Sequence, residues 1–324
     1  MRGRWTRQSA YFLPAISWLS IATGLALGQT GPPRLLAPGV LRVISSNAQI
    51  AESFTGPEKM VELTEHKIID WMPHFAPQTQ TVYDKAQRII LRREIWNLEF
   101  AFKPLRVMTI EVPQPSGKMQ RKVVWYMVYR IRYLGSNISA SKQPDGTYLP
   151  FVSEHKDGRY FLPQFLLTTH ELKKTYMDQP IPIALDPISL RERPDGPLHD
   201  SVTIASKPIP LNRDSDSAGV WGVAMWQDVD PRIDFLTVDI KGLTNAYIPS
   251  DPAGEFQDGD KPGKGRQLQS KTLRLHFWKP GDTTDEPEDV VRFGVPVDED
   301  PLLQQEILTI YGVKTRVDYE WVYR

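Results

Sequence analysis

The feature that most constrains this chain is a pair of long, aromatic-rich segments between Trp96 and Tyr133. In the first segment Trp96, Leu98, Phe100 and Phe102 fall on one parity, which is the period of a strand with one buried face. The return segment repeats the pattern on one apolar face, formed by Val123, Trp125, Met127, Tyr129, Ile131 and Tyr133. An isolated pair of strands is marginal in water, so these strands must cover a second layer. The sequence therefore predicts an all-β fold, an antiparallel β-sandwich that is immunoglobulin-like or related, with this pair at its centre.

Shorter strand signals follow, bounded by Gly, Pro or Asp. They predict strands at Tyr148–Val152, Tyr160–Leu167, Val220–Trp226, Ile233–Ile240, Thr272–Trp278, Val290–Val295 and Thr315–Tyr323. One helix is expected from Pro301 to Tyr311, since Asp300 can cap it and Gly312 can end it. Thr168–Met177 is predicted to form one or two helical turns. The Pro-rich stretch Gln179–Pro210 is expected to consist of extended segments and loops crossing a sheet edge.

The N-terminal residues have the organisation of an export signal. A basic stretch containing Arg2, Arg4 and Arg7 precedes an apolar run, and small residues then permit cleavage before Gln29. The alternative is an uncleaved membrane anchor, the one route by which this chain is expected to meet a membrane. The expected organisation is a signal peptide over 1–28, a linker or arm over 29–56 and the β-sandwich domain over 57–324. Two packed sub-domains dividing near 200–218 are the alternative, and a short helix is expected at Pro57–Asp70.

Charge and cysteine content exclude several classes of function. Lysine plus arginine and aspartate plus glutamate number 39 each, so net charge gives no reason to expect nucleic acid as a partner. Cysteine is absent, which excludes disulfides, thiolate catalysis and cysteine metal sites. The expected location is the periplasm, the cell surface or the medium, with a protein or an envelope polysaccharide as partner.

Several segments resemble conserved hypothetical exported proteins of planctomycete-type bacteria. The resemblance spans most of the chain from about Glu94 onward, and these segments carry it: Phe102–Arg106, Pro113–Lys122, Val124–Tyr129, Asp228–Phe235, Gly242–Tyr247 and Val317–Arg324. By the same resemblance, Asp298–Lys314 looks like an insertion. The resemblance implies an exported, β-rich protein and brings no activity, cofactor or catalytic residue.

Two groups of residues are candidates for metal binding. His66, Asp70 and His74 have the spacing of one helix face, but Pro73 would end such a helix before the last ligand. Loop aspartates could hold a structural calcium ion, and the candidates are Asp228, Asp230, Asp258 and Asp260. None matches an EF-hand, and the alternative is a set of solvated turns. Apart from calcium, no cofactor is expected.

The search for catalytic motifs is mostly negative. The chain has no Gly-x-Ser-x-Gly elbow, no phosphate-binding Gly-rich loop and no His-Glu-x-x-His pair. We therefore expect a non-enzymatic envelope, surface or interaction module. A carbohydrate-binding sandwich and a carboxylate-dependent hydrolase are the alternatives. Exposed tryptophans on one concave face would favour the first alternative, and two carboxylates in a cleft, one of them desolvated, would favour the second.

Overall fold

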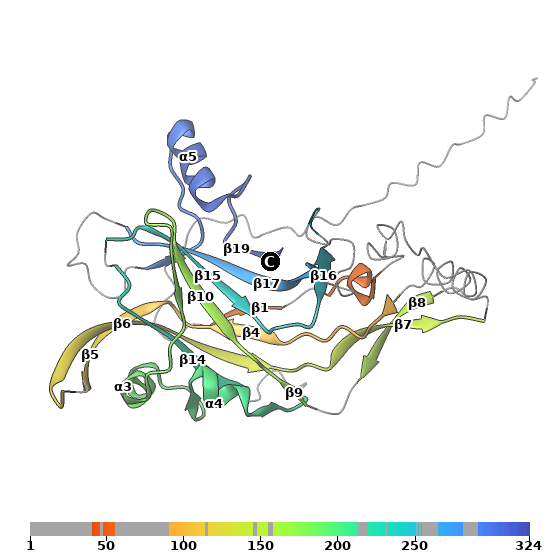
Figure 1. Cartoon of the computed structure of the whole chain (residues 1–324), viewed down its shortest axis with the longest axis horizontal. Coiled ribbons are helices and arrows are strands. Elements are labelled where there is room, and N and C mark those ends of the chain that lie inside the picture. Colours follow the sequence, from red (N-terminus) through yellow and green to blue (C-terminus); the bar gives the residue numbers. More distant parts are fainter. Residues whose placement is uncertain are drawn as a thin grey trace, which may run out of the picture.

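The protein is an all-β sandwich of antiparallel sheets that do not close into a barrel, as the sequence predicts (Figure 1). The computed structural model describes residues 41–45, 48–55, 91–113, 116–144, 148–154, 158–212, 219–230, 232–250, 252, 254, 265–280 and 291–324. The predicted signal peptide, the helix at Pro57–Asp70 and the group His66, Asp70 and His74 lie outside these residues.

The first sheet is organised around β6 (Met119–Arg132), the longest strand of the molecule. Its order is β1 (Arg42–Ile44), β4 (Glu99–Phe102), β6, β14 (Val220–Gln227) and β12 (Leu198–His199), and β5 (Arg106–Pro113) also pairs with β6. The segment between the two aromatic-rich runs is thus more than a connection, because it contains β5. One edge of β6 is shared, with β5 opposite residues 119–126 and β4 opposite residues 129–132.

The second sheet is organised around β17 (Gln267–Trp278). Its order is β11 (Lys174–Met177), β10 (Gln164–Thr169), β15 (Phe235–Lys241), β17 and β16 (Tyr247–Ser250), while β18 (Arg292–Phe293) and β19 (Tyr319–Tyr323) also pair with β17. The final strand is shorter than predicted and starts at Tyr319. Its pairing of Trp321 opposite Leu273 nevertheless places it within the sheet.

The main core lies between these sheets and contains the aromatic face that the sequence identifies. Phe100, Phe102, Trp125 and Tyr129 are buried there together with apolar residues of β15 and β17, and Trp96 and Trp321 pack against the same cluster. Val123 is the exception, with 49% of its surface exposed. It lies on the part of β6 that pairs with β5 near the end of the ribbon, opposite Thr109.

The opposite face of the first sheet is buried as well. Val124, Tyr126 and Val128 pack against α3 (Pro182–Glu192), which lies below this sheet in Figure 1. The prediction of extended segments and loops over Gln179–Pro210 was therefore wrong where the chain forms α3 and the short helix α4 (Ser201–Ala205), although β12 within this range does lie at the edge of the first sheet. The error arose because proline usually argues against a helix. One proline of α3 occupies its first turn, where no hydrogen bond is lost, and Ile181, Ala184 and Ile188 bury an apolar stripe.

The prediction of helical turns over Thr168–Met177 was also wrong. This segment completes β10 and then forms β11, which pairs with it from Leu166 opposite Met177 to Thr169 opposite Lys174. Lys173 has a φ of 50°, so a non-glycine residue makes the tight turn. No Gly or Asn occupies that position, so residue types alone do not indicate a hairpin there.

The helix predicted at Pro301–Tyr311 is present as α5 with the expected ends. The Asp300 side chain accepts a hydrogen bond from the amide of Leu302, and Gly312 ends the helix with a φ of 70°. Figure 1 shows α5 on the side of the second sheet that faces away from the first.

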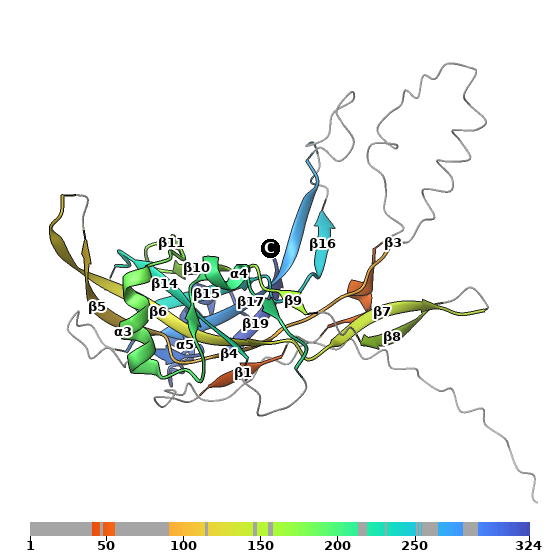
Figure 2. The same ribbon diagram turned by 90° about the horizontal axis from the view of Figure 1, so that it is seen from below.

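Three short strand pairs complete the described residues, and some β-ribbons extend beyond the body. The pairs are β2 (Phe54–Thr55) with β3 (Leu91–Arg92), β7 (Ser136–Lys142) with β8 (Tyr148–Glu154), and β9 (Arg159–Tyr160) with β13 (Pro208–Ile209). Figure 2 shows the β7–β8 hairpin, the β5–β6 tip and the β16–β17 ribbon each projecting from the sandwich.

The short turn that follows β1 is joined to the second sheet. Glu52, in the 3-10 turn η1 (Ile50–Ser53), is buried and lies 2.5 Å from the Lys271 ammonium, while the Tyr323 hydroxyl donates to it at 2.6 Å. Because a buried carboxylate is tolerated only when paired, this contact fixes η1 against β17 and β19.

Candidate functional site

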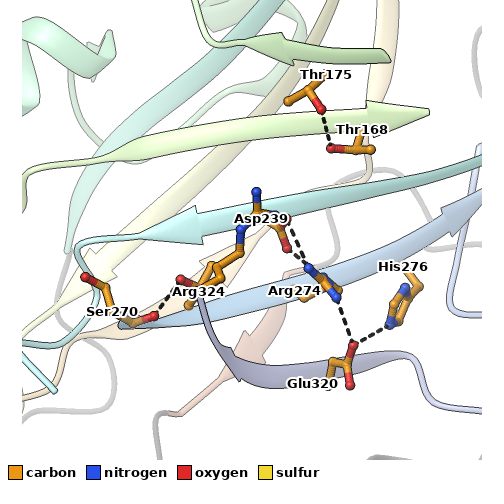
Figure 3. Close-up of polar contacts among 9 residues, drawn as sticks. Thr168, Thr175, Asp239, Ser270, Arg274, His276, Glu320 and Arg324 are labelled. Carbon is orange, nitrogen blue, oxygen red and sulfur yellow. Dashed lines mark hydrogen bonds and ion pairs between the residues drawn. The ribbon is translucent and has the colours of Figure 1, made fainter. Parts of the chain in front are cut away.

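The outer face of the second sheet brings together a group of charged and titratable side chains. We call it the outer-face cluster, and it consists of Asp239 on β15, Arg274 and His276 on β17, Glu320 on β19 and Arg324 just after β19. Figure 3 shows these residues across three neighbouring strands. Their positions alternate with Val238, Leu273 and Leu275 of the main core, so the pleat turns them away from it.

Asp239 is the centre of the cluster. Its side chain is 1% exposed and accepts a hydrogen bond of 2.8 Å from the Arg274 Nε, and the Arg324 guanidinium also contacts it. A desolvated carboxylate is tolerated here because guanidinium groups on two sides offset the cost of its burial.

Glu320 and His276 complete the network at its other end. The Glu320 Oε1 lies 3.5 Å from the Arg274 Nη1 and 3.7 Å from the His276 Nε2. Burial raises the pKa of Glu320, and the Arg274 charge opposes that rise. Burial also lowers the pKa of His276 to about 3, with Arg274 and His170 acting in the same direction, so this imidazole is uncharged at neutral pH.

This arrangement balances charge rather than activating a nucleophile. Asp239 and Glu320 share Arg274, and the neighbouring imidazole is neutral. The hydrolase alternative calls for two carboxylates in a cleft, one of them desolvated, but in this cluster both Asp239 and Glu320 contact Arg274. The geometry therefore favours a structural or surface role for the cluster.

A second group, the histidine–tyrosine stack, joins this face to α5. The Tyr311 ring centroid lies 5.0 Å from that of His170 and 5.1 Å from that of His276, both edge-on. The Tyr311 hydroxyl donates to the Phe277 carbonyl at 2.6 Å. Sequence left these histidines scattered, and only the pairing of β10, β15 and β17 brings them together.

A third group lies on the other side of the molecule, under the end of α3. The Glu192 carboxylate is buried, accepts a hydrogen bond of 2.9 Å from the Tyr126 hydroxyl and lies 3.5 Å from the Arg106 Nε and 3.8 Å from the Lys103 Nζ. Burial, followed by the charge of Glu192, raises the pKa of Tyr126. These contacts hold α3 against the strand pair β5–β6, so their role is structural.

A fourth group surrounds Asp178, at the end of β11. Its carboxylate accepts hydrogen bonds from the Ser201 hydroxyl and, at 2.6 Å, from the Met225 amide. Burial raises the pKa of Asp178 to about 6, although both hydrogen bonds oppose the rise. The side chain ties β11 and α4 to β14.

The loop aspartates proposed as calcium ligands have cations as partners where the structure describes them. Asp228 is exposed and lies 3.4 Å from the Lys122 Nζ, and Asp230 forms a two-pronged pair with Arg232 that lowers its pKa to about 2. Asp258 and Asp260 lie outside the described residues. Within the described ranges, no three His, Asp or Glu side chains are grouped closely enough to hold a metal ion.

The tryptophans do not form a sugar-binding platform in the described part of the chain. Trp125, Trp221 and Trp226 are buried, while Trp96 and Trp321 are half-buried against the main core. Trp278 is half-buried, with the Arg292 guanidinium 4.9 Å from its ring centre. No row of exposed indoles is therefore present in these segments.

Sequence reasoning found the strands of the outer-face cluster but not the cluster itself. A usable signal was present, since Asp239, Arg274 and His276 each interrupt a run of apolar strand residues at the parity opposite to the core. To predict that these residues lie together, one needs the register in which β15, β17 and β19 pair. The alternation of apolar and polar residues in one sequence does not provide that register.

Comparison with known proteins adds no relative: no protein-family model, no curated protein and no solved structure matches this chain. The resemblance to exported proteins of planctomycete-type bacteria stays a prediction. Among the described residues, no helix has the length and apolar character needed to cross a membrane.

Proposed function

We propose that this protein is an exported, non-enzymatic module of the cell envelope or cell surface that acts by binding another protein. Export is supported by the basic stretch, apolar run and small residues at the N-terminus. A non-enzymatic role is supported by the charge-balanced clusters, in which the carboxylates Asp239, Glu192 and Glu52 each contact a cationic side chain.

The observation that carries the proposal is the exposed apolar surface of the projecting β7–β8 hairpin. Leu149, Phe151 and Val152 are 56%, 57% and 61% exposed. Leu149 and Phe151 lie opposite Ser141 and Ser139, so that one face alternates apolar groups and hydroxyls. A two-stranded ribbon with apolar side chains in water is marginal alone, which favours a partner that covers it.

A protein is favoured over a polysaccharide as that partner. On the face that carries Leu149 and Phe151, Phe151 is a single ring, which is less than the row of rings on which a sugar chain stacks, whereas apolar side chains with neighbouring hydroxyls suit a protein surface. Pro150 interrupts the donors of β8, so the partner is expected on a face of the hairpin rather than as an added strand.

The test is site-specific photo-crosslinking in the organism that makes the protein. A photoreactive residue at Phe151 should give one discrete adduct with another envelope protein. The same residue at Leu190 of α3, which is 79% exposed, is the matched control and should give none. Substituting Leu149→Ser, on the same face as Phe151, should remove the adduct while leaving the melting temperature unchanged. Equal labelling at both positions would contradict the proposal, as would intact Met1 on cytoplasmic protein.

A further inference from the structure

The seat of α5 on the second sheet is small and separate from the main core. Leu308 and Tyr311 are the buried residues of α5, and they form a satellite cluster with Val295, Phe235, Ile307 and Val313. If α5 left the sheet, the satellite cluster would become exposed, but the main core between the two sheets would stay intact. The helix is therefore able to move without unfolding the sandwich.

Two imidazoles pack against α5 at this seat. Both ring nitrogens of His276 and the Nε2 of His170 are buried without such a partner in the described part of the chain, and both rings pack edge-on against Tyr311. His276 is 0% exposed. A neutral imidazole pays a modest desolvation cost here, whereas a protonated one would bury a positive charge.

We propose that α5 is an acid-released latch, held on the outer face of the second sheet only while the imidazoles of His170 and His276 are uncharged. On protonation, the preferred state is the one in which Tyr311 leaves and water reaches both rings. This inference is independent of the binding function proposed above.

The charges around the stack do not reverse this preference. Arg274 on β17 opposes a positive charge on both histidines. Glu171 and Asp239 favour a charge on His170, and the Glu320 Oε1 lies 3.7 Å from the His276 Nε2, but Asp239 and Glu320 already contact Arg274. Burial outweighs these carboxylates and is the largest cause lowering the pKa of each histidine. Glu171, beside His170, accepts hydrogen bonds from the amides of Asp234 and Phe235 at 2.9 and 2.6 Å. Glu306 of α5 is exposed.

The direction of the pH dependence follows from these surroundings. Burial is the largest cause lowering the pKa of each histidine, and that of His276 falls to about 3. A histidine whose pKa is lowered in the seated state stabilises that state. This contribution is full at pH values above the ordinary histidine pKa of about 6.5. That contribution is lost as the pH falls from about 6.5 toward 3. The latch therefore opens with acidification.

The experiment is hydrogen–deuterium exchange of the full chain between pH 7 and pH 5, corrected for the pH dependence of unprotected amides. Opening of α5 should rise roughly 25-fold over this interval through His276 alone, because the open state takes up a proton that the seated state excludes. Amides of β6 and β14 should show no comparable change. His276→Phe and His170→Phe, which keep a ring against Tyr311, should flatten the response, and His199→Gln is the matched control outside the stack.

Two results would overturn the latch. One is an α5 whose protection falls no more than that of β6 on acidification, and the other is an unchanged acid response in the doubly substituted protein. If His276→Phe does not fold, the imidazole carbon resonances of the unsubstituted protein decide the matter. A His276 that titrates near 6.5 while α5 stays protected would refute the proposal.

Discussion

Gly222→Ala is the substitution whose cost the structure defines best. Gly222 on β14 is directly opposite Tyr129 on β6, and a Cβ added there would lie 2.4 Å from the Tyr129 Cζ and 2.5 Å from its hydroxyl oxygen. Ordinary carbon contacts begin at about 3.5 Å, so the ring would have to move by about 1 Å. Phe100 and Phe165 hold that ring, with centroids 5.5 and 4.9 Å away.

The expected loss of stability follows from two opposing effects. Overpacking a close-packed core costs about 1 to 3 kcal/mol, and the trapped Tyr129 ring places this site at the upper end. The lower entropy of alanine in the unfolded chain returns about 0.4 to 1 kcal/mol. We expect a net loss of about 2 kcal/mol, a shift of about 0.4 M in the guanidinium midpoint if the m-value is about 5 kcal/mol/M.

The assay is equilibrium denaturation with a matched glycine control. A Cβ at Gly196 would meet the Trp221 Cδ1 at 3.7 Å, an ordinary contact, so Gly196→Ala should be neutral. Adding Tyr129→Leu should make Gly222→Ala less costly, with a coupling of at least about 0.5 kcal/mol. Equal midpoints for the two alanine variants would show that β6 and β14 do not pair in the register described.

Three further predictions address other layers of the structure. Trp125→Ala, which removes a buried indole of the main core, should cost about 3 to 5 kcal/mol, whereas an unchanged denaturant midpoint would mean that the face is misassigned. Deleting residues 315–324 removes β19 and the anchors Trp321 and Tyr323, so the protein should unfold or aggregate; a soluble monomer with an unaltered circular dichroism spectrum would make β19 dispensable. Asp178 has a folded pKa of about 6, above its ordinary value, so its contribution is full below about pH 4 and lost as the pH rises through 6. Asp178→Asn should therefore raise the melting temperature at pH 8 and leave it nearly unchanged at pH 4, and a lower melting temperature at pH 8 would contradict this reasoning.

Much of the architecture was accessible from residue patterns. Alternation located β6, β14, β15 and β17, and capping chemistry located both ends of α5, because these signals depend only on neighbours in the chain. The buried second face of β6 was less clear, since Lys122 and Arg130 interrupt it and only the packing of α3 explains Val124, Tyr126 and Val128.

The remaining errors have physical causes. Prolines at the start and inside of α3 masked a helix, and Lys173 made a hairpin turn in a left-handed conformation that its sequence does not announce. The charged clusters join residues far apart in the chain, such as Glu52 with Lys271 and Asp239 with Arg324. Local patterns carry no information about such pairs.

The edge of β6 that pairs with β14 is without its partner while the protein is being synthesised. Its hairpin partner β5 is a neighbour in sequence, but β14, which covers the other edge, begins roughly ninety residues later. At a synthesis rate of about 5 to 20 residues per second, β14 is synthesised about 5 to 20 seconds after β6, and this edge of β6 is unpaired during that time. Strands that are far apart in the sequence pair slowly, and the unpaired edge of an aromatic strand can pair with another chain and aggregate. We therefore expect a chaperone that binds this edge before β14 is made to lower aggregation during synthesis.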